Sequence, residues 1–326
     1  MDLPTQSGPV YLELDWARAK AETVLLLHGM GSCGEDWLLQ RVELRGSYHL
    51  LSLDLPGHGH SRTLAGWPSV GSLAHVAQQA ILRWAPTRPV HLLGLSLGAA
   101  VSLQLLVDHP QLIRSAVLVN GFGSGLLAGR GLRHAMQRGV LIAAGRMDLL
   151  GERIAAGLFP RPEQAGFRAL AARRIGANSW WSYLKLLSAI ARFDLRPRLA
   201  AIACPVLLIS GARDDTVPRT ASRQLARRIA HSKWVVLPNA KHAAPIDSAE
   251  AFNACLLEFL TSFIIDYHYE KRALSRYYFF VIWYPAGYWL LSSLAAIKGF
   301  FNVVRRKGIT VKWKSPDRGI HTLRLL

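Results

Sequence analysis

The fold is decided by one stretch, Val90-His91-Leu92-Leu93-Gly94-Leu95-Ser96-Leu97-Gly98-Ala99-Ala100. It starts as an apolar strand, passes through a Gly-x-Ser-x-Gly turn and continues as a helix. Gly94 and Gly98 leave room for a tight strand-to-helix turn, which exposes the hydroxyl of Ser96. The helix that follows directs its N-terminal N–H groups and its dipole toward developing negative charge. The stretch therefore predicts that Ser96 is a nucleophile.

Strands and helices alternate on both sides of this stretch. Alternating apolar and polar residues predict an edge strand at 11–16. Apolar runs predict strands at 23–27, 48–53, 113–120, 205–210 and 233–237. Helical spacing predicts helices from Asp36, over 72–84, 97–109 and 248–263, and after Pro218. Strands that alternate with helices form a parallel sheet with crossover helices, so we expect a doubly wound α/β domain.

Residues 121–195 have a different composition and interrupt this alternation. The segment is rich in Ala, Arg and Gly, has helical spacing and contains no convincing strand. We expect a helical lid, inserted at the carboxyl edge of the sheet, and call residues 121–195 the insertion. The expected organisation is a core in two parts (1–120 and 196–264), the insertion between them, and a tail (265–326).

Five motifs in order along the chain resemble the α/β-hydrolase superfamily over about residues 10–264. They are His28-Gly29, Asp54-Leu55-Pro56-Gly57-His58-Gly59-His60-Ser61, Gly94-Leu95-Ser96-Leu97-Gly98, Gly211-Ala212-Arg213-Asp214 with Val217-Pro218, and Lys241-His242-Ala243. The resemblance implies the α/β-hydrolase fold and the chain order nucleophile, acid, histidine.

Each candidate site residue has a chemical task. Ser96 is a weak nucleophile that needs a base, and His242, in the loop after the last predicted strand, is the candidate. The resemblance assigns the carboxylate that orients this histidine to Asp214, with Asp215 as the alternative. The N–H groups of Met30 and Leu97 are expected to form the oxyanion hole.

These residues predict a serine hydrolase that cleaves a carboxylic ester or thioester through an acyl-enzyme. Two alternatives stay open: a C–C bond hydrolase of the same fold, and a non-catalytic membrane adaptor linked to polysaccharide export. No cofactor and no metal are expected, because His58 and His60 lack a carboxylate at metal-ligand spacing. The three cysteines are far apart in the sequence, which fits a reducing compartment.

The charge of the chain is concentrated in two blocks. The formal net charge is +18. The segment 121–200 has 13 Lys and Arg against 4 Asp and Glu, and the tail has 11 against 3. No nucleic-acid motif accompanies this charge. The arginines of the insertion are interpreted either as solvated helix faces or as a basic rim for an acidic substrate or carrier.

An apolar group in the insertion also has two interpretations. Its members are Trp180, Trp181, Tyr183, Leu184 and Leu187. They are expected either to line an acyl pocket or to form the core of the insertion itself.

The tail contains a run of 21 residues without a charged side chain, 277–297. This length suffices to cross a bilayer, and aromatic and basic residues flank it as at a membrane interface. The motifs Ile282-Trp283-Tyr284-Pro285, Tyr288-Trp289 and 313–320 are similar to the C-terminal membrane segment and tail of bacterial poly-N-acetylglucosamine synthases. We expect membrane association on the cytoplasmic side, by a spanning or a re-entrant segment. The alternative for the tail is a helix packed on the domain. At the other end of the chain, the N-terminal sequence shows no signal-peptide pattern.

Overall fold

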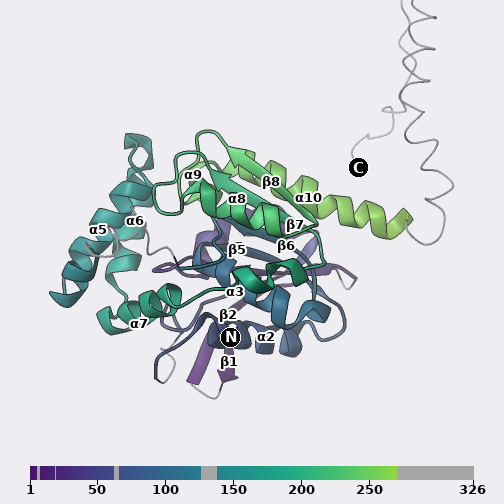
Figure 1. Cartoon of the computed structure of the whole chain (residues 1–326), viewed down its shortest axis with the longest axis horizontal. Helices are drawn as coiled ribbons and strands as arrows, with labels where there is room; N and C mark the ends of the chain where they lie inside the picture. The colour runs from purple at the N-terminus through teal and green to yellow at the C-terminus, as the bar shows by residue number, and fades with distance from the viewer. Residues whose placement is uncertain (6–7, 19, 62–65, 126–137, 270–326) are drawn as a thin grey trace, which may run out of the picture. The chain divides into compact units, whose positions relative to one another are not determined.

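The computed structural model describes residues 1–5, 8–18, 20–61, 66–125 and 138–269. The chain divides into two units, and the larger of them is Met1–Leu260. The centre of this unit, within the described residues, is an eight-stranded sheet in the order β1-β2-β4-β3-β5-β6-β7-β8 (Figure 1). The strands are β1 (Asp2–Thr5), β2 (Gly8–Asp15), β3 (Glu22–Leu27), β4 (Tyr48–Leu53), β5 (Val90–Leu95), β6 (Ile113–Val119), β7 (Val206–Gly211) and β8 (Ser232–Leu237). From β4 to β8 all pairings are parallel, while β1 and β2 pair antiparallel at one edge.

Helices cover both faces of this sheet, because alternate side chains of the buried strands point to opposite faces. Leu25 and Leu27 of β3 belong to the apolar core with α2, α3 and α8, whereas Val24 and Leu26 belong to the core with α1 and α10. The helices of the two layers are α1 (Leu38–Leu44), α2 (Val70–Trp84), α3 (Leu97–Asp108), α8 (Arg219–Arg228), α9 (Ala244–Asp247) and α10 (Ala249–Tyr269). Short 3₁₀ turns are η1 (Gly34–Trp37), η2 (Pro110–Leu112), η3 (Pro162–Gln164) and η4 (Arg196–Ala201). The predicted doubly wound, mostly parallel sheet is confirmed.

The insertion is helical in its described part. It contains a helical stretch at 138–143, then α5 (Met147–Leu158), α6 (Ala165–Gly176) and α7 (Trp180–Ala191). Helices α5 and α6 lie side by side at one end of the sheet (Figure 1). Gly151 permits this close packing, since a Cβ there would lie 2.3 Å from the carbonyl oxygen of Ala172.

The apolar group of the insertion divides between core and surface. Tyr183 is buried in a small core of the insertion, and Leu184 and Leu187 pack against this core. Trp180 and Trp181 are 47% and 42% exposed, so they do not belong to the core of the insertion, and they do not line the pocket above Ser96. The two indoles contact each other outside the core, with ring centroids 5.3 Å apart and ring planes tilted by 59°.

The amino end of the sheet holds a buried polar cluster. The ring of His91 is fully buried in β5, and its Nε2 donates to the Glu22 carboxylate of β3 at 3.0 Å. The other ring nitrogen, Nδ1, lies 2.7 Å from Ser115 Oγ of β6. The hydrogen bond from His91 lowers the pKa of Glu22, so this cluster ties three strands through an ionised carboxylate.

The described helices include none whose length and apolar character would let it cross a membrane. The run 277–297 and the tail motifs lie outside the described residues.

Candidate active site

The nucleophile candidate sits in a strained turn between β5 and α3. Ser96 has φ 55° and ψ −108°, a conformation that costs free energy in a non-glycine residue and is concentrated at functional sites. A Cβ on Gly98 would lie 2.0 Å from the carbonyl oxygen of Leu27, and one on Gly94 would lie 2.5 Å from the carbonyl of Gly98. The turn therefore packs backbone against backbone at the carboxyl end of β3, which only glycine permits.

The loop after β8 carries His242 to the same edge of the sheet. Its Nδ1 donates to Asp214 Oδ2 at 2.7 Å, and the Asp214 side chain is fully buried. The other oxygen of this carboxylate, Oδ1, accepts the N–H groups of Thr216 at 2.7 Å and Val217 at 3.1 Å. Because the carboxylate only accepts, the proton of the neutral imidazole is on Nδ1, and Nε2 keeps its lone pair.

Asp215 points to a different partner. Its side chain is 73% exposed and its Oδ2 lies 3.1 Å from Lys241 Nζ. Of the two carboxylates considered from the sequence, Asp214 is therefore the one against His242.

Asn120, which was not among the predicted site residues, supports the histidine loop. It directly follows β6 with φ 46° and is buried. Its Nδ2 donates to the carbonyl oxygens of His242 at 2.8 Å and Lys241 at 3.2 Å, and its Oδ1 accepts the N–H of Gly211 at 2.9 Å. The available signal was an Asn at the end of the predicted strand 113–120, since Asn tolerates positive φ better than most residues.

His28 braces the loop that carries Met30. Its Nε2 accepts the N–H of Leu55 at 2.9 Å, so its Nδ1 donates to the carbonyl oxygen of Gly29 at 2.7 Å. Burial lowers the pKa of His28 to about 4, which keeps the ring neutral and this tautomer fixed.

The turn at 54–61 is likewise held by hydrogen bonds between buried side chains and the backbone. Asp54 accepts the N–H groups of Gly34 at 2.7 Å and His60 at 2.8 Å, so it joins this turn to η1. Burial lowers the pKa of His58 to about 3. Within the described part of the chain, no three His, Cys, Asp or Glu side chains are grouped as ligands for a metal ion.

A pocket opens above Ser96 and His242, which both line it together with Met30. Counted to its open mouth, it encloses about 990 Å³. The insertion contributes most of its apolar wall, including Phe159, Phe167, Leu170, Ile175 and Tyr183. Ser96, His242 and an apolar wall therefore share one open space.

Arg174 joins the insertion to the core at the rim of this pocket. Its guanidinium contacts the carboxylates of both Glu35 and Asp36, and Ser32 donates to Asp36 as well. Sequence analysis placed Arg174 among the arginines of a solvated face or a basic rim. Its side chain is instead largely buried and paired with two carboxylates.

The comparison with protein families gives one clear match. The model of the Alpha/beta hydrolase family matches residues 24–254. The chain belongs to this family.

Relatives of this alpha/beta hydrolase include RutD of Klebsiella pneumoniae (strain 342), a proposed carbamate hydrolase. It is 34% identical over 254 residues, which cover 75% of this chain and 93% of RutD. Among solved structures, a hydrolase from Pseudomonas aeruginosa PA01 superposes with a TM-score of 0.72 at 26% identity, over 80% of this chain and 97% of that one. The enol-lactonase from Burkholderia xenovorans LB400 superposes with a TM-score of 0.74 at 23% identity, over 80% and 100%. The last match concerns the fold alone.

The family match ends at residue 254, so it does not extend to the tail. The resemblance of the tail to poly-N-acetylglucosamine synthases finds no support in these comparisons.

Proposed function

We propose that this alpha/beta hydrolase is a serine hydrolase that cleaves a carboxylic ester or thioester through an acyl-enzyme on Ser96. The observation that carries the proposal is the 2.7 Å hydrogen bond from His242 to the buried Asp214, with His242 and Ser96 on one pocket. This hydrogen bond leaves Nε2 of the imidazole as a base.

In the proposed mechanism, His242 Nε2 takes the proton of Ser96 while Oγ forms a bond to the acyl carbon. The N–H groups of Met30 and Leu97 stabilise the resulting oxyanion. When the carbonyl re-forms, the bond to the leaving oxygen or sulfur breaks, and the imidazolium gives that atom its proton. A water molecule then attacks the acyl-enzyme, His242 takes its proton, and the acid leaves Ser96 with the proton returned.

The insertion is proposed to act as a lid over this pocket. Its apolar wall favours an acyl group over a polar one, since burial of apolar surface stabilises binding by about 25 cal/mol per Å². Arg174 supports the proposal because it holds α6 against the loop after β3.

Carbamate cleavage is the second candidate. It is favoured by the 34% identity to RutD over most of both chains. The same steps apply, with a carbamoyl carbon in place of the acyl carbon. 4-Nitrophenyl butyrate, S-4-nitrophenyl thiobutyrate and a 4-nitrophenyl carbamate have analogous chromogenic leaving groups, and their kcat/KM values, each divided by the rate of spontaneous hydrolysis, rank the candidates.

Covalent labelling with a fluorophosphonate tests the proposal. The wild-type protein should be labelled and inactivated with the adduct on Ser96, and folded Ser96→Ala should neither be labelled nor hydrolyse esters. Ser32→Ala is the matched control, because Ser32 lines the same pocket but donates its hydroxyl to Asp36. Wild-type turnover in folded Ser96→Ala would refute the mechanism. A wild-type protein that neither labels nor hydrolyses any of these substrates would favour a non-catalytic role.

A further inference from the structure

A second pocket adjoins the first one at the histidine. It encloses about 820 Å³, counted to its open mouth, and its wall comes from the insertion and from the loops after β7 and β8. His242 and Thr216 line both pockets, as do Ile154, Leu158 and Arg138. Ser96 and Met30 line the first pocket and are not part of the second. The two spaces therefore meet at His242.

This arrangement separates the two parts of a substrate. The general acid must reach the leaving atom within hydrogen-bond distance, so the leaving group departs on the side of His242. The acyl group has the apolar first pocket beside Ser96, which leaves the second pocket for the leaving group.

Resting on the proposed function, we propose that the second pocket binds an anionic group, a carboxylate or a phosphate, on the leaving-group part of the substrate. Among the described residues, three cationic side chains line it, Arg138, Arg153 and Lys241. One carboxylate, Asp215, lines it too, and this group is mostly exposed and lies against Lys241. The wall therefore carries an excess of positive charge.

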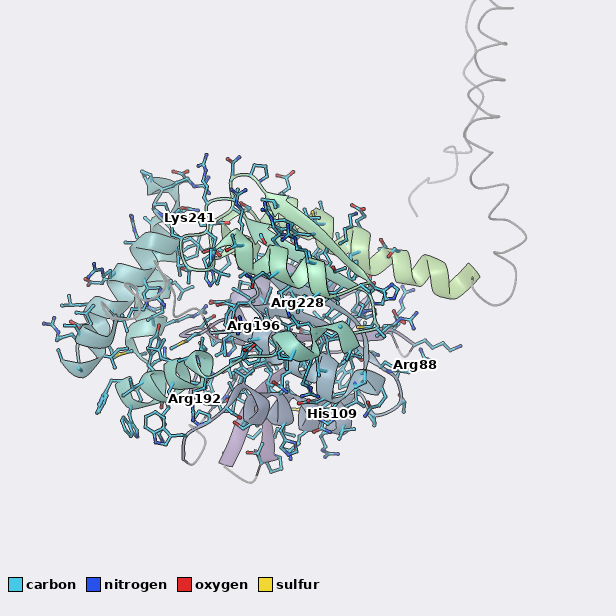
Figure 2. All side chains as sticks on the ribbon, in the orientation of Figure 1. Arg88, His109, Arg192, Arg196, Arg228 and Lys241 are labelled. Atoms are coloured by element: carbon cyan, nitrogen blue, oxygen red, sulfur yellow. The ribbon has the colours of Figure 1, made fainter. Side chains whose placement is uncertain are left out.

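Two of these cations are placed to meet an anion. Lys241 donates from Nζ to the carbonyl oxygen of Gly157 in α5 at 3.0 Å, which holds its ammonium between the core and the insertion. Figure 2 shows Lys241 on the side of the core that faces the insertion. Arg138 has no carboxylate partner among the described residues. Guanidinium groups suit planar or tetrahedral oxyanions because their N–H donors form a rigid fork.

The contrast with Arg174 supports this assignment. Arg174 lines the first pocket, but its charge is matched by Glu35 and Asp36. Among the described residues, the first pocket shares Arg138 with the second but lacks Arg153 and Lys241, so the anion is assigned to the second pocket and the leaving group.

Three butyryl thioesters test the proposal, since they share one acyl group and differ in the charge of the thiol. The thiols are 3-mercaptopropionate, 2-mercaptoethanol and 2-mercaptoethyltrimethylammonium, and thiol release is followed at pH 7. The readout is the ratio of kcat/KM for the anionic over the neutral thioester, compared between variants so that intrinsic reactivity cancels. In Arg138→Gln/Arg153→Gln this ratio should fall about tenfold or more, because a hydrogen bond to a charged group contributes about 1.5–3 kcal/mol.

Arg173→Gln is the matched control, since Arg173 is an exposed arginine of α6 that lines neither pocket. It removes one positive charge from the insertion, as Arg138→Gln does, and should leave the ratio unchanged. The single variant Arg138→Gln, checked by thermal melting, serves if the double variant does not fold. An unchanged ratio in the pocket variants, an equal fall in Arg173→Gln, or wild-type preference for the cationic thioester would overturn the proposal.

Calorimetric binding of free 3-mercaptopropionate separates this proposal from the proposed function, because it requires no turnover. Wild-type protein should bind the anion at least tenfold more tightly than Arg138→Gln/Arg153→Gln. Anion binding without hydrolysis of any thioester would refute thioester cleavage and retain the site. Hydrolysis of the neutral thioester with no anion binding would refute the anion site and retain thioester cleavage.

Discussion

Replacement of Asp214 by Asn should reverse the tautomer of His242. The Oδ1 atom of Asp214 accepts two backbone N–H groups, from Thr216 and Val217. The amide oxygen of the introduced side chain would keep these hydrogen bonds, so its NH₂ group would face the imidazole. His242 Nδ1 would then accept, its proton would lie on Nε2, and Nε2 would no longer act as a base toward Ser96.

The size of the effect follows from the same contacts. The reactive tautomer of the variant loses a hydrogen bond to a charged group, about 1.5–3 kcal/mol, and leaves two donors facing each other, about 1–3 kcal/mol more. Because Asp214 is fully buried, solvent does not screen either cost. The sum, about 4 kcal/mol, corresponds to a loss of roughly a thousandfold in kcat/KM.

Ester hydrolysis by Asp214→Asn and Asp215→Asn, each with its circular dichroism spectrum and melting curve, checks this reasoning. The exposed Asp215 pairs with Lys241, so its replacement should change kcat/KM by less than about threefold. A folded Asp214→Asn protein that kept a tenth of wild-type activity would refute the tautomer argument. A larger loss in Asp215→Asn would transfer the orienting role to that residue.

Three further predictions concern the turn, the sheet and the tail. Gly98→Ala places a Cβ 2.0 Å from the carbonyl oxygen that ends β3, so kcat should fall about a hundredfold and stability by about 1–3 kcal/mol. The control is Gly166→Ala in α6, whose Cβ meets no atom within 4 Å; it should leave kcat unchanged and should not lower the melting temperature, because alanine is favoured over glycine in a helix by about 0.5–1 kcal/mol. Glu22→Gln should destabilise the protein by about 1 kcal/mol at pH 7. Since the pKa of Glu22 is lowered by His91 below its usual 4.5, that stability is present above pH 4.5 and is lost as pH falls, so the melting curves of wild type and variant should converge in acid. Truncation after Ile264 should keep full hydrolysis, because the family match and the larger unit both end before this residue. We propose that only the full-length chain sediments with membranes. A truncated protein that unfolds, or a full-length protein that stays in the supernatant, would count against this proposal.

The centre of the sheet was predictable because its strands are buried on both faces. Such strands need continuous apolar runs, and the runs at 23–27 and 48–53 lie within one residue of β3 and β4. The edge strand β8 is only partly buried, and its prediction at 233–237 also lies within one residue of its bounds. Strand β1 was not predicted, since four residues that include Pro4 carry no such run. The helix expected at 248–263 starts at Ala249 and is preceded by the separate short helix α9.

The site was predictable only where a local motif marks it. The elbow around Ser96 and the loops of Asp214 and His242 have recognisable sequences at the ends of strands. No local motif marks Asn120 or Arg174, because their roles depend on partners far along the chain. Asn120 donates to the carbonyl oxygens of residues 241 and 242. Arg174 pairs with the carboxylates of residues 35 and 36. The exposure of Trp180 and Trp181 likewise depends on how the insertion packs, which helical spacing alone does not determine.

The three hydrogen bonds of Asn120 have a consequence for protein engineering. They connect the ends of β6 and β7 to the histidine loop inside the core, independently of α5, α6 and α7. We therefore expect the proposed chemistry and the choice of substrate to depend on separable parts of the chain. If the helices between β6 and β7 are exchanged for those of another hydrolase, the contact between His242 and Asp214 should stay in place, which would make this chain a scaffold for transplanting binding walls.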